Sequence, residues 1–157
     1  MIIKSNHLGF TLIEILMVIL LLGILGAAAT SQFINFSDDA HATMTSEKLA
    51  ALKIAIVGDA RSISAGKYTN LGYEAHCKGV PVSLTDLITQ PGAGTCSVDY
   101  DPFTKRGWRG PYVSNTDTNY NNDSWGTALV YSSGGRTITS CGPNATCTDG
   151  DDIQISF

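Results

Sequence analysis

The acidic residue Glu14 lies within the most apolar stretch of this 157-residue chain, at residues 10–29. Thr11 is the only other polar side chain in that stretch. A carboxylate in apolar surroundings is costly unless a cation pairs with it, so such an acid indicates a function and needs a partner. Cleavage between Gly9 and Phe10 would provide one, because it creates an α-amine four residues before Glu14. The amine and the carboxylate could pair within one helix or between neighbouring helices, and so set the register of an assembly.

The length of this apolar stretch is that of a membrane span, because as a helix it measures roughly 30 Å, the thickness of the hydrocarbon core. Lys4 precedes it, and no Lys or Arg follows it until Lys48. The positive-inside rule therefore predicts a single pass with Met1 in the cytoplasm and the rest of the chain outside. A secretory signal peptide cut after small residues at 27–29 and a plain anchor are the alternatives. The stretch exceeds the ~7–15 residues of a signal-peptide core, and neither alternative explains the acid.

The four cysteines all follow the apolar stretch and therefore share one compartment: Cys77, Cys96, Cys141 and Cys147. An even number of cysteines on an exported domain favours disulfides, and four cysteines allow three pairings. We favour Cys77 with Cys96 and Cys141 with Cys147, because each pair encloses a turn-rich stretch that a local loop can close. A structural zinc site is the alternative, but neither gap has the Cys-x2–4-Cys spacing that such sites usually show.

Beyond residue 29, apolar side chains recur mostly three or four positions apart as far as Ile63, with charged residues between them. This spacing predicts an amphipathic helix over 31–65 that continues the membrane helix and ends at Gly66. We also expect a short helix after Ser83, and three strands at 128–132, 136–140 and 152–157. A small antiparallel sheet packed on the helix would bury the apolar surfaces of both, so the predicted fold class is α+β.

The N-terminus resembles the processing signal of type IV prepilins and type II secretion pseudopilins over about 4–33. The resemblance rests on Lys4, Gly9-Phe10-Thr11-Leu12-Ile13-Glu14 and Gly23-Ile24-Leu25. It implies cleavage after Gly9 and N-methylation of Phe10 by prepilin peptidase, with Glu14 acting in the assembly of a helical filament. It also implies a pilin fold, with a leader at 1–9, a membrane and filament-core helix at 10–30, the amphipathic half at 31–65 and a globular head at 66–157. These proteins usually carry a proline where this chain has Ser31, which leaves a helix break there open.

The head resembles the major pseudopilin of type II secretion over about 84–153. The resemblance rests on Leu84-x-x-Leu87, Gly107-Trp108-x-Gly110-Pro111-Tyr112-Val113 and Asp123-x-Trp125-Gly126. That family binds calcium in the loop before its last strand, which implies Ca²⁺ ligands here at Asn144, Asp151 and Asp152, with Asp149 and Ser140 as further candidates. Oxygen ligands on an irregular loop suit this ion. A disulfide across the loop could instead hold it shut, and Asn144 stands where the family usually has Asp.

Neither catalysis nor nucleic-acid binding is indicated. The chain lacks G-x-S-x-G, G-x-x-x-x-G-K and H-E-x-x-H, whose spacing serves catalysis or phosphate binding. His76 and Cys77 are neighbours in sequence, whereas a catalytic pair has to be adjacent in space. The formal net charge is −4, and the short basic cluster of Lys105, Arg106 and Arg109 is most simply a solvated loop, with a phosphate-binding role as the alternative. We therefore predict that the chain is not an enzyme.

The function expected is that of a structural subunit of a type II secretion pseudopilus or a type IV pilus. A second resemblance, to mannose-sensitive-haemagglutinin-type pilins, rests on the stretch 33–40 and on the cysteines. The partners implied are further copies of the chain, prepilin peptidase, an inner-membrane assembly platform and minor pilins. The chain would lie in the bacterial inner membrane with its head in the periplasm, and then enter a periplasmic pseudopilus or a cell-surface pilus. A minor pilin with an adhesive or binding role and a monomeric membrane-anchored domain are the alternatives.

Overall fold

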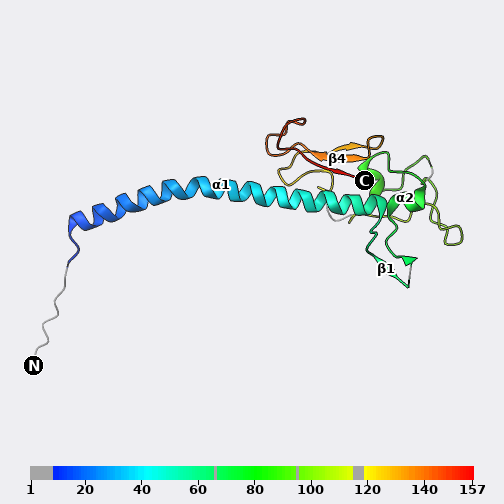
Figure 1. Cartoon of the computed structure of the whole chain (residues 1–157), viewed down its shortest axis with the longest axis horizontal. Helices are drawn as coiled ribbons and strands as arrows, with labels where there is room; N and C mark the ends of the chain where they lie inside the picture. The colour runs from blue at the N-terminus through cyan, green and yellow to red at the C-terminus, as the bar shows by residue number, and fades with distance from the viewer. Residues whose placement is uncertain (1–8, 66, 95, 115–118) are drawn as a thin grey trace, which may run out of the picture. The chain divides into compact units, whose positions relative to one another are not determined.

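The computed structural model describes residues 9–65, 67–94, 96–114 and 119–157, with the backbone alone at 28–35 and 68. The predicted leader, apart from Gly9, lies outside the described residues. The elements are, in chain order, α1 (Leu12–Val57), β1 (Ile63–Ser64), β2 (Lys67–Tyr68), α2 (Gly72–Cys77), the 3-10 helix η1 (Leu84–Leu87), β3 (Val130–Ser132), β4 (Thr137–Ser140) and β5 (Ile153–Ser156) (Figure 1). The chain divides into two compact units, Met1–Asp39 and Ala40–Phe157, and α1 contributes to both.

In the N-terminal unit, α1 begins where Thr11 caps it. The backbone N–H of Glu14 donates to Thr11 Oγ1 at 3.3 Å, and Thr-x-x-Glu is the spacing of a capping box. The helix is continuous through Ser31, so the break that the sequence left open does not occur. The large apolar side chains at 12–25 are between 45% and 84% exposed and have no cover in this unit. Within the described residues, no helix meets the length and hydropathy expected of a membrane span.

The prediction that the amphipathic helix reaches residue 65 is wrong, because α1 ends at Val57. Gly58 follows with a φ of +89°, and its N–H still donates to the Ile54 carbonyl at 2.8 Å. A Cβ at Gly58 would lie 2.5 Å from the carbonyl oxygen of Asn70, so the chain turns here at a glycine that packs against a distant backbone segment. Ile63, counted as helical from the spacing, instead lies in β1 and is 56% exposed.

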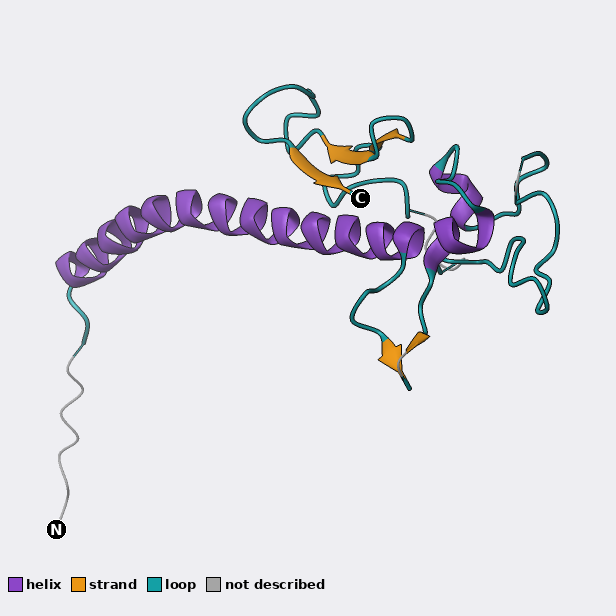
Figure 2. Ribbon diagram, turned by 45° about the vertical axis from the view of Figure 1, so that its right-hand side comes forward, coloured by secondary structure: helices purple, strands orange, loops and turns teal. Residues whose placement is uncertain are grey.

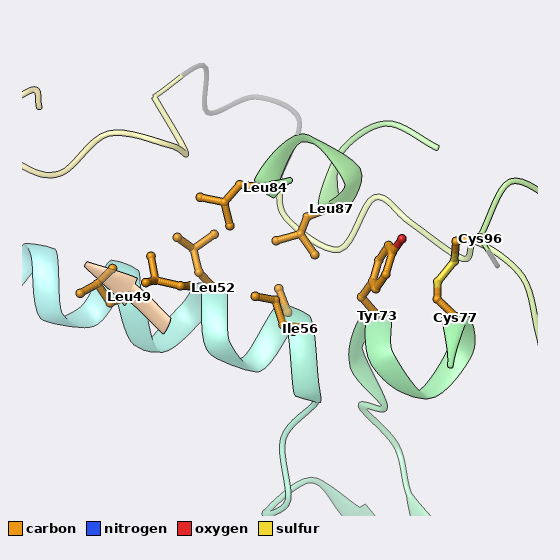
Figure 3. Close-up of a cluster of buried hydrophobic side chains, with 10 residues drawn as sticks. Leu49, Leu52, Ile56, Tyr73, Cys77, Leu84, Leu87 and Cys96 are labelled. Atoms are coloured by element: carbon orange, nitrogen blue, oxygen red, sulfur yellow. A yellow bond between two sulfur atoms is a disulfide. The ribbon is translucent and has the colours of Figure 1, made fainter. Parts of the chain in front are cut away.

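The core of the C-terminal unit lies on one stripe of α1. Leu49, Leu52 and Ile56 recur at helical spacing and are at most 2% exposed. Figure 3 shows their side chains beside η1 and α2, and the buried cluster also includes Tyr73, Cys77, Leu84, Leu87, Cys96 and Ile138. The predicted short helix after Ser83 is η1, whose capping box joins Ser83 and Asp86. The apolar stripe of α1 is therefore covered from several segments of the head.

Strands β3, β4 and β5 form one antiparallel sheet in that order (Figure 2). The fully buried Ile138 of β4 lies opposite Tyr131 of β3 and Ile155 of β5. In β5, Ile153 and Ile155 pack against the core while Gln154 between them is exposed. The three predicted strands are confirmed, each one or two residues shorter than expected, and the fold is α+β.

Candidate functional site

The predicted processing site lies just before the first helical turn. Gly9 and Phe10 have no regular secondary structure, and Phe10 is 76% exposed. A Cβ built at Gly9 would meet no heavy atom within 4 Å, so the backbone there is open on that side. An accessible, non-helical segment is the form in which a peptidase can bind a chain. Lys4, the basic residue of the predicted signal, lies outside the described residues.

Glu14 lies in the first turn of α1 and is exposed. The free N–H groups at the start of a helix carry a partial positive charge, which favours an acidic side chain there. Among the described residues, Glu14 forms no ion pair with another side chain. Its exposed carboxylate lies beside the exposed apolar side chains at the start of α1, where an external cation could contact it.

Both disulfides form as the sequence analysis favoured. Cys77, the last residue of α2, is bonded to Cys96 with a Cα–Cα distance of 5.0 Å, and both are 1% exposed. Cys141 is bonded to Cys147 with a Cα–Cα distance of 4.4 Å and closes the loop that follows β4. These bonds occupy all four thiols, so the zinc alternative and the pairing of His76 with a free Cys77 are both wrong.

The loop between β4 and β5 brings four of the five predicted calcium ligands together. Asp149, Asp151 and Asp152 each offer a carboxylate oxygen within 4.8 Å of the others. The Asn144 amide nitrogen donates to Asp149 Oδ2 at 2.7 Å and to Asp151 Oδ1 at 3.1 Å. We call these four residues the acidic loop. Its side chains are oxygen-rich, as a hard divalent cation requires.

Ser140 has a different role from the one predicted. Its hydroxyl is fully buried and donates to Asp123 Oδ2 at 2.7 Å. The other carboxylate oxygen of Asp123 accepts the backbone N–H groups of Trp125 at 3.1 Å and Thr127 at 2.8 Å. Ser140 therefore fixes a buried Asp-centred turn. The sequence indicated this turn, because Asp123 three residues before Gly126 favours hydrogen bonds from nearby backbone N–H groups to its carboxylate. The contact with Ser140 could not be predicted in this way, because the two residues are 17 positions apart.

The acidic loop carries closely spaced negative charges. Hydrogen bonds from Asp151 and Asn144 lower the pKa of Asp149, while the neighbouring Asp149 carboxylate raises the pKa of Asp151. Asp152 accepts the Thr148 backbone N–H at 2.7 Å through Oδ2, and its buried Oδ1 has no hydrogen-bond partner among the described residues. Crowded carboxylates that leave one oxygen unsatisfied are an arrangement that a bound cation would stabilise.

Comparison with known proteins gives two matches. The family profile described as the prokaryotic N-terminal methylation motif matches residues 4–30. The chain is also similar to the type II secretion system core protein G of Xanthomonas campestris pv. campestris, with 27% identity over 128 residues. That alignment covers 82% of this chain and 70% of the relative. No solved structure matches the chain at a significant level.

Proposed function

We propose that this type IV pilin-like chain is a structural subunit of a filament, which is assembled through its N-terminal helix after removal of a leader. The single observation that carries the proposal is the methylation motif at 4–30, which coincides with the start of α1 and its exposed apolar side chains. The similarity to core protein G of type II secretion, over most of the chain, supports a pseudopilus in preference to a surface pilus.

In this proposal, the chain is first held at the inner membrane by residues 10–30, with the head in the periplasm. Prepilin peptidase then cuts after Gly9 and methylates the new N-terminus at Phe10. The α-amine released by the cut provides the cation that Glu14 lacks among the described residues, either in its own chain or in a neighbouring copy. Further copies, an assembly platform and minor pilins are the proposed partners.

Mass spectrometry of the mature protein tests the processing step. We expect a chain that starts at Phe10 and carries one methyl group on its α-amine.

A Glu14→Gln variant tests the role of the carboxylate, because it removes the charge but retains the shape of the side chain. It should be processed normally, and the number of filaments should fall at least about tenfold, because an amine left unpaired in apolar surroundings is heavily penalised. A mature chain that starts near Thr30 would show an ordinary secreted protein, and normal filament numbers in Glu14→Gln would remove the register role.

We also propose that the acidic loop binds a calcium ion, with Asn144, Asp149, Asp151 and Asp152 as the residues that would hold it. The support is the unsatisfied Oδ1 of Asp152 beside two further carboxylates. An ion there would neutralise the crowded charge and order the loop. Calcium should therefore raise the melting temperature of the full-length protein relative to a chelator, and Asp152→Asn should abolish that difference. Asp38→Asn, at an exposed position of α1, is the matched control; equal melting with calcium and chelator in the wild type would contradict the site.

A further inference from the structure

A pocket of about 330 Å³ in the C-terminal unit is rich in hydrogen-bond donors. It lies between the last turns of α1, the segment that leads into α2, and residues 109–112. Its polar lining comprises Thr69, Asn70, His76, Arg109 and Tyr112, and no Asp or Glu is among the described residues that line it. A pocket with a cation, several donors and no acid is suited to an anionic ligand.

One ring nitrogen of His76 has a hydrogen-bond partner in the wall of the pocket. The backbone N–H of Arg109 donates to Tyr112 Oη at 3.1 Å, and the same Oη lies 3.3 Å from His76 Nδ1, where either group can be the donor; we assign the hydroxyl as the donor. Burial lowers the pKa of His76, against the opposing effect of the Gly72 backbone, and so favours the neutral imidazole. A neutral ring that accepts at Nδ1 has its hydrogen on Nε2.

This Nε2–H group is an unsatisfied donor. His76 is only 5% exposed, and its Nε2 has no hydrogen-bond partner among the described residues. A buried donor without an acceptor costs about 1–3 kcal/mol, which a ligand oxygen would recover. The structure thus contains a buried side chain with unused hydrogen-bonding capacity in the wall of the pocket.

Arg109 gives the pocket its charge. Its side chain is exposed, lies over the Tyr100 ring at 5.1 Å and forms no ion pair among the described residues. The positive charge of Arg109 also contributes to the lowered pKa of His76. A guanidinium pairs with a carboxylate through two parallel hydrogen bonds, a geometry that a spherical anion cannot use.

Part of the pocket wall is apolar. Ala51, Ile54 and Ala55 of α1 line it together with Leu71. We propose that the pocket binds a small organic carboxylate, whose charged group contacts Arg109 and His76 Nε2 and whose apolar part rests on this wall. The same chemistry is offered by a free acid and by the C-terminal carboxylate of a polypeptide. The proposal does not depend on filament formation.

Nuclear magnetic resonance of the full-length protein in detergent micelles tests the proposal, with benzoate as the probe for a free acid. We expect saturable changes at the His76 ring nitrogens, nitrogen shifts typical of the Nε2–H form, and a rise in the pKa of His76 on binding, because a bound anion stabilises the imidazolium. Benzamide, which has the same shape without the charge, should not saturate the pocket. N-acetylphenylalanine and its amide repeat the comparison for a polypeptide terminus, and preference for this acid over benzoate would assign the pocket to that source.

Two variants decide whether the named residues act as proposed. Arg109→Gln should weaken benzoate binding by about tenfold or more, since a charge-assisted bidentate pair is lost. Lys105→Gln, at an exposed position outside the pocket, is the matched control and should bind as the wild type does. Tyr112→Phe should weaken binding less and shift the nitrogen signals, because His76 loses the hydroxyl that selects its tautomer. Equal affinity for benzoate and benzamide, or unchanged affinity in Arg109→Gln, would overturn the proposal.

Discussion

The two halves of α1 have the same secondary structure and opposite surroundings. In the N-terminal unit, the large apolar side chains at 12–25 are between 45% and 84% exposed. In the C-terminal unit, Leu49, Leu52 and Ile56 are at most 2% exposed and are covered by η1, α2 and the sheet. One half of the helix is therefore covered by the rest of its unit, whereas the apolar surface of the other half is uncovered among the described residues.

Because of this difference, we expect the C-terminal half of α1 to affect the stability of the protein and the N-terminal half to affect its assembly. Most of the stability of a helix in water comes from packing of its apolar face, so the C-terminal half of α1 is stable through contacts made within one chain. The apolar side chains of the N-terminal half are exposed among the described residues, and Glu14 lies between them in the first turn. Changes in the C-terminal unit should therefore alter the free energy of unfolding, and changes in the N-terminal half should alter assembly instead.

The largest effect on unfolding is expected from Ile56→Ala. Ile56 is fully buried, so its truncation should lower the free energy of unfolding by about 3 kcal/mol through lost burial and a residual cavity. Leu21→Ala removes a side chain that is 58% exposed and should leave the free energy of unfolding of the head unchanged. Urea titration of the full-length protein in detergent measures both, with the fluorescence of Trp108 and Trp125, which lie in the C-terminal unit, as the signal. Equal losses in both variants would break the distinction between the halves.

The next largest effect on stability is expected from removal of either disulfide. Replacing Cys77 and Cys96 by Ser opens a loop with a sequence separation of 19 and should cost about 3 kcal/mol, whereas the pair Cys141 and Cys147, with a separation of 6, should cost about 2 kcal/mol. The first pair is also buried in the core, which adds to its cost. Melting temperatures of the two double variants under oxidising conditions give the order. A larger loss for the second pair would show that the acidic loop, rather than the core, limits the stability of the head.

The same substitution can be compared at two glycines, Gly23 within α1 and Gly58 in the turn that follows it. Gly58→Ala places a Cβ at a φ of +89° and 2.5 Å from the Asn70 carbonyl oxygen, so we expect a loss of about 2 kcal/mol. Gly23→Ala adds a methyl group where no heavy atom lies within 4 Å and should leave the head unaffected. Urea unfolding measures the first variant, and helical content by circular dichroism measures the second. A tolerated Gly58→Ala would mean that the turn after α1 adjusts freely.

The smallest effect tests whether charge pairing also stabilises the C-terminal unit. Arg136 forms two hydrogen bonds with Glu74, at 2.9 and 2.8 Å, and the bonds with Arg136 lower the pKa of Glu74. Both side chains are more than a third exposed, at 41% for Arg136 and 35% for Glu74. Solvent screening therefore limits the contribution of the pair to the free energy of unfolding to about 0.5–1 kcal/mol. Glu74→Gln should lose this amount at neutral pH, and the exposed Glu47→Gln should not.

The same variant has a defined pH dependence. The folded-state pKa of Glu74 lies below its ordinary value of 4.5, so the contribution is complete above that value and disappears as the pH falls through the folded-state pKa. Unfolding of the wild type and of Glu74→Gln should therefore differ at neutral pH and converge in acid. A difference that persists unchanged in acid would show that the loss comes from packing rather than from charge.

Much of the molecule could be predicted because it depends on neighbouring residues. The methylation motif is contiguous, the strand after the acidic loop follows from the alternation of Ile153, Gln154 and Ile155, and both disulfides close local loops. The alternation of apolar and polar side chains also predicted that a sheet would cover the helix. In each case the pattern and the interaction that it predicts lie within a few residues or within one turn-rich loop.

The tertiary structure alone decided where α1 ends and what several polar side chains do. The amphipathic spacing continues to Ile63, but Gly58 turns the chain because it packs against Asn70, a contact that no local pattern contains. Ser140 was assigned to the metal loop and instead bonds Asp123, and His76 Nδ1 lies within hydrogen-bond distance of the Tyr112 hydroxyl. The amino-acid sequence by itself determined which segments are apolar, where the methylation motif lies and which cysteines are close. Contacts between distant segments determined burial and hydrogen-bond partners, because these depend on which surfaces meet after the chain has folded.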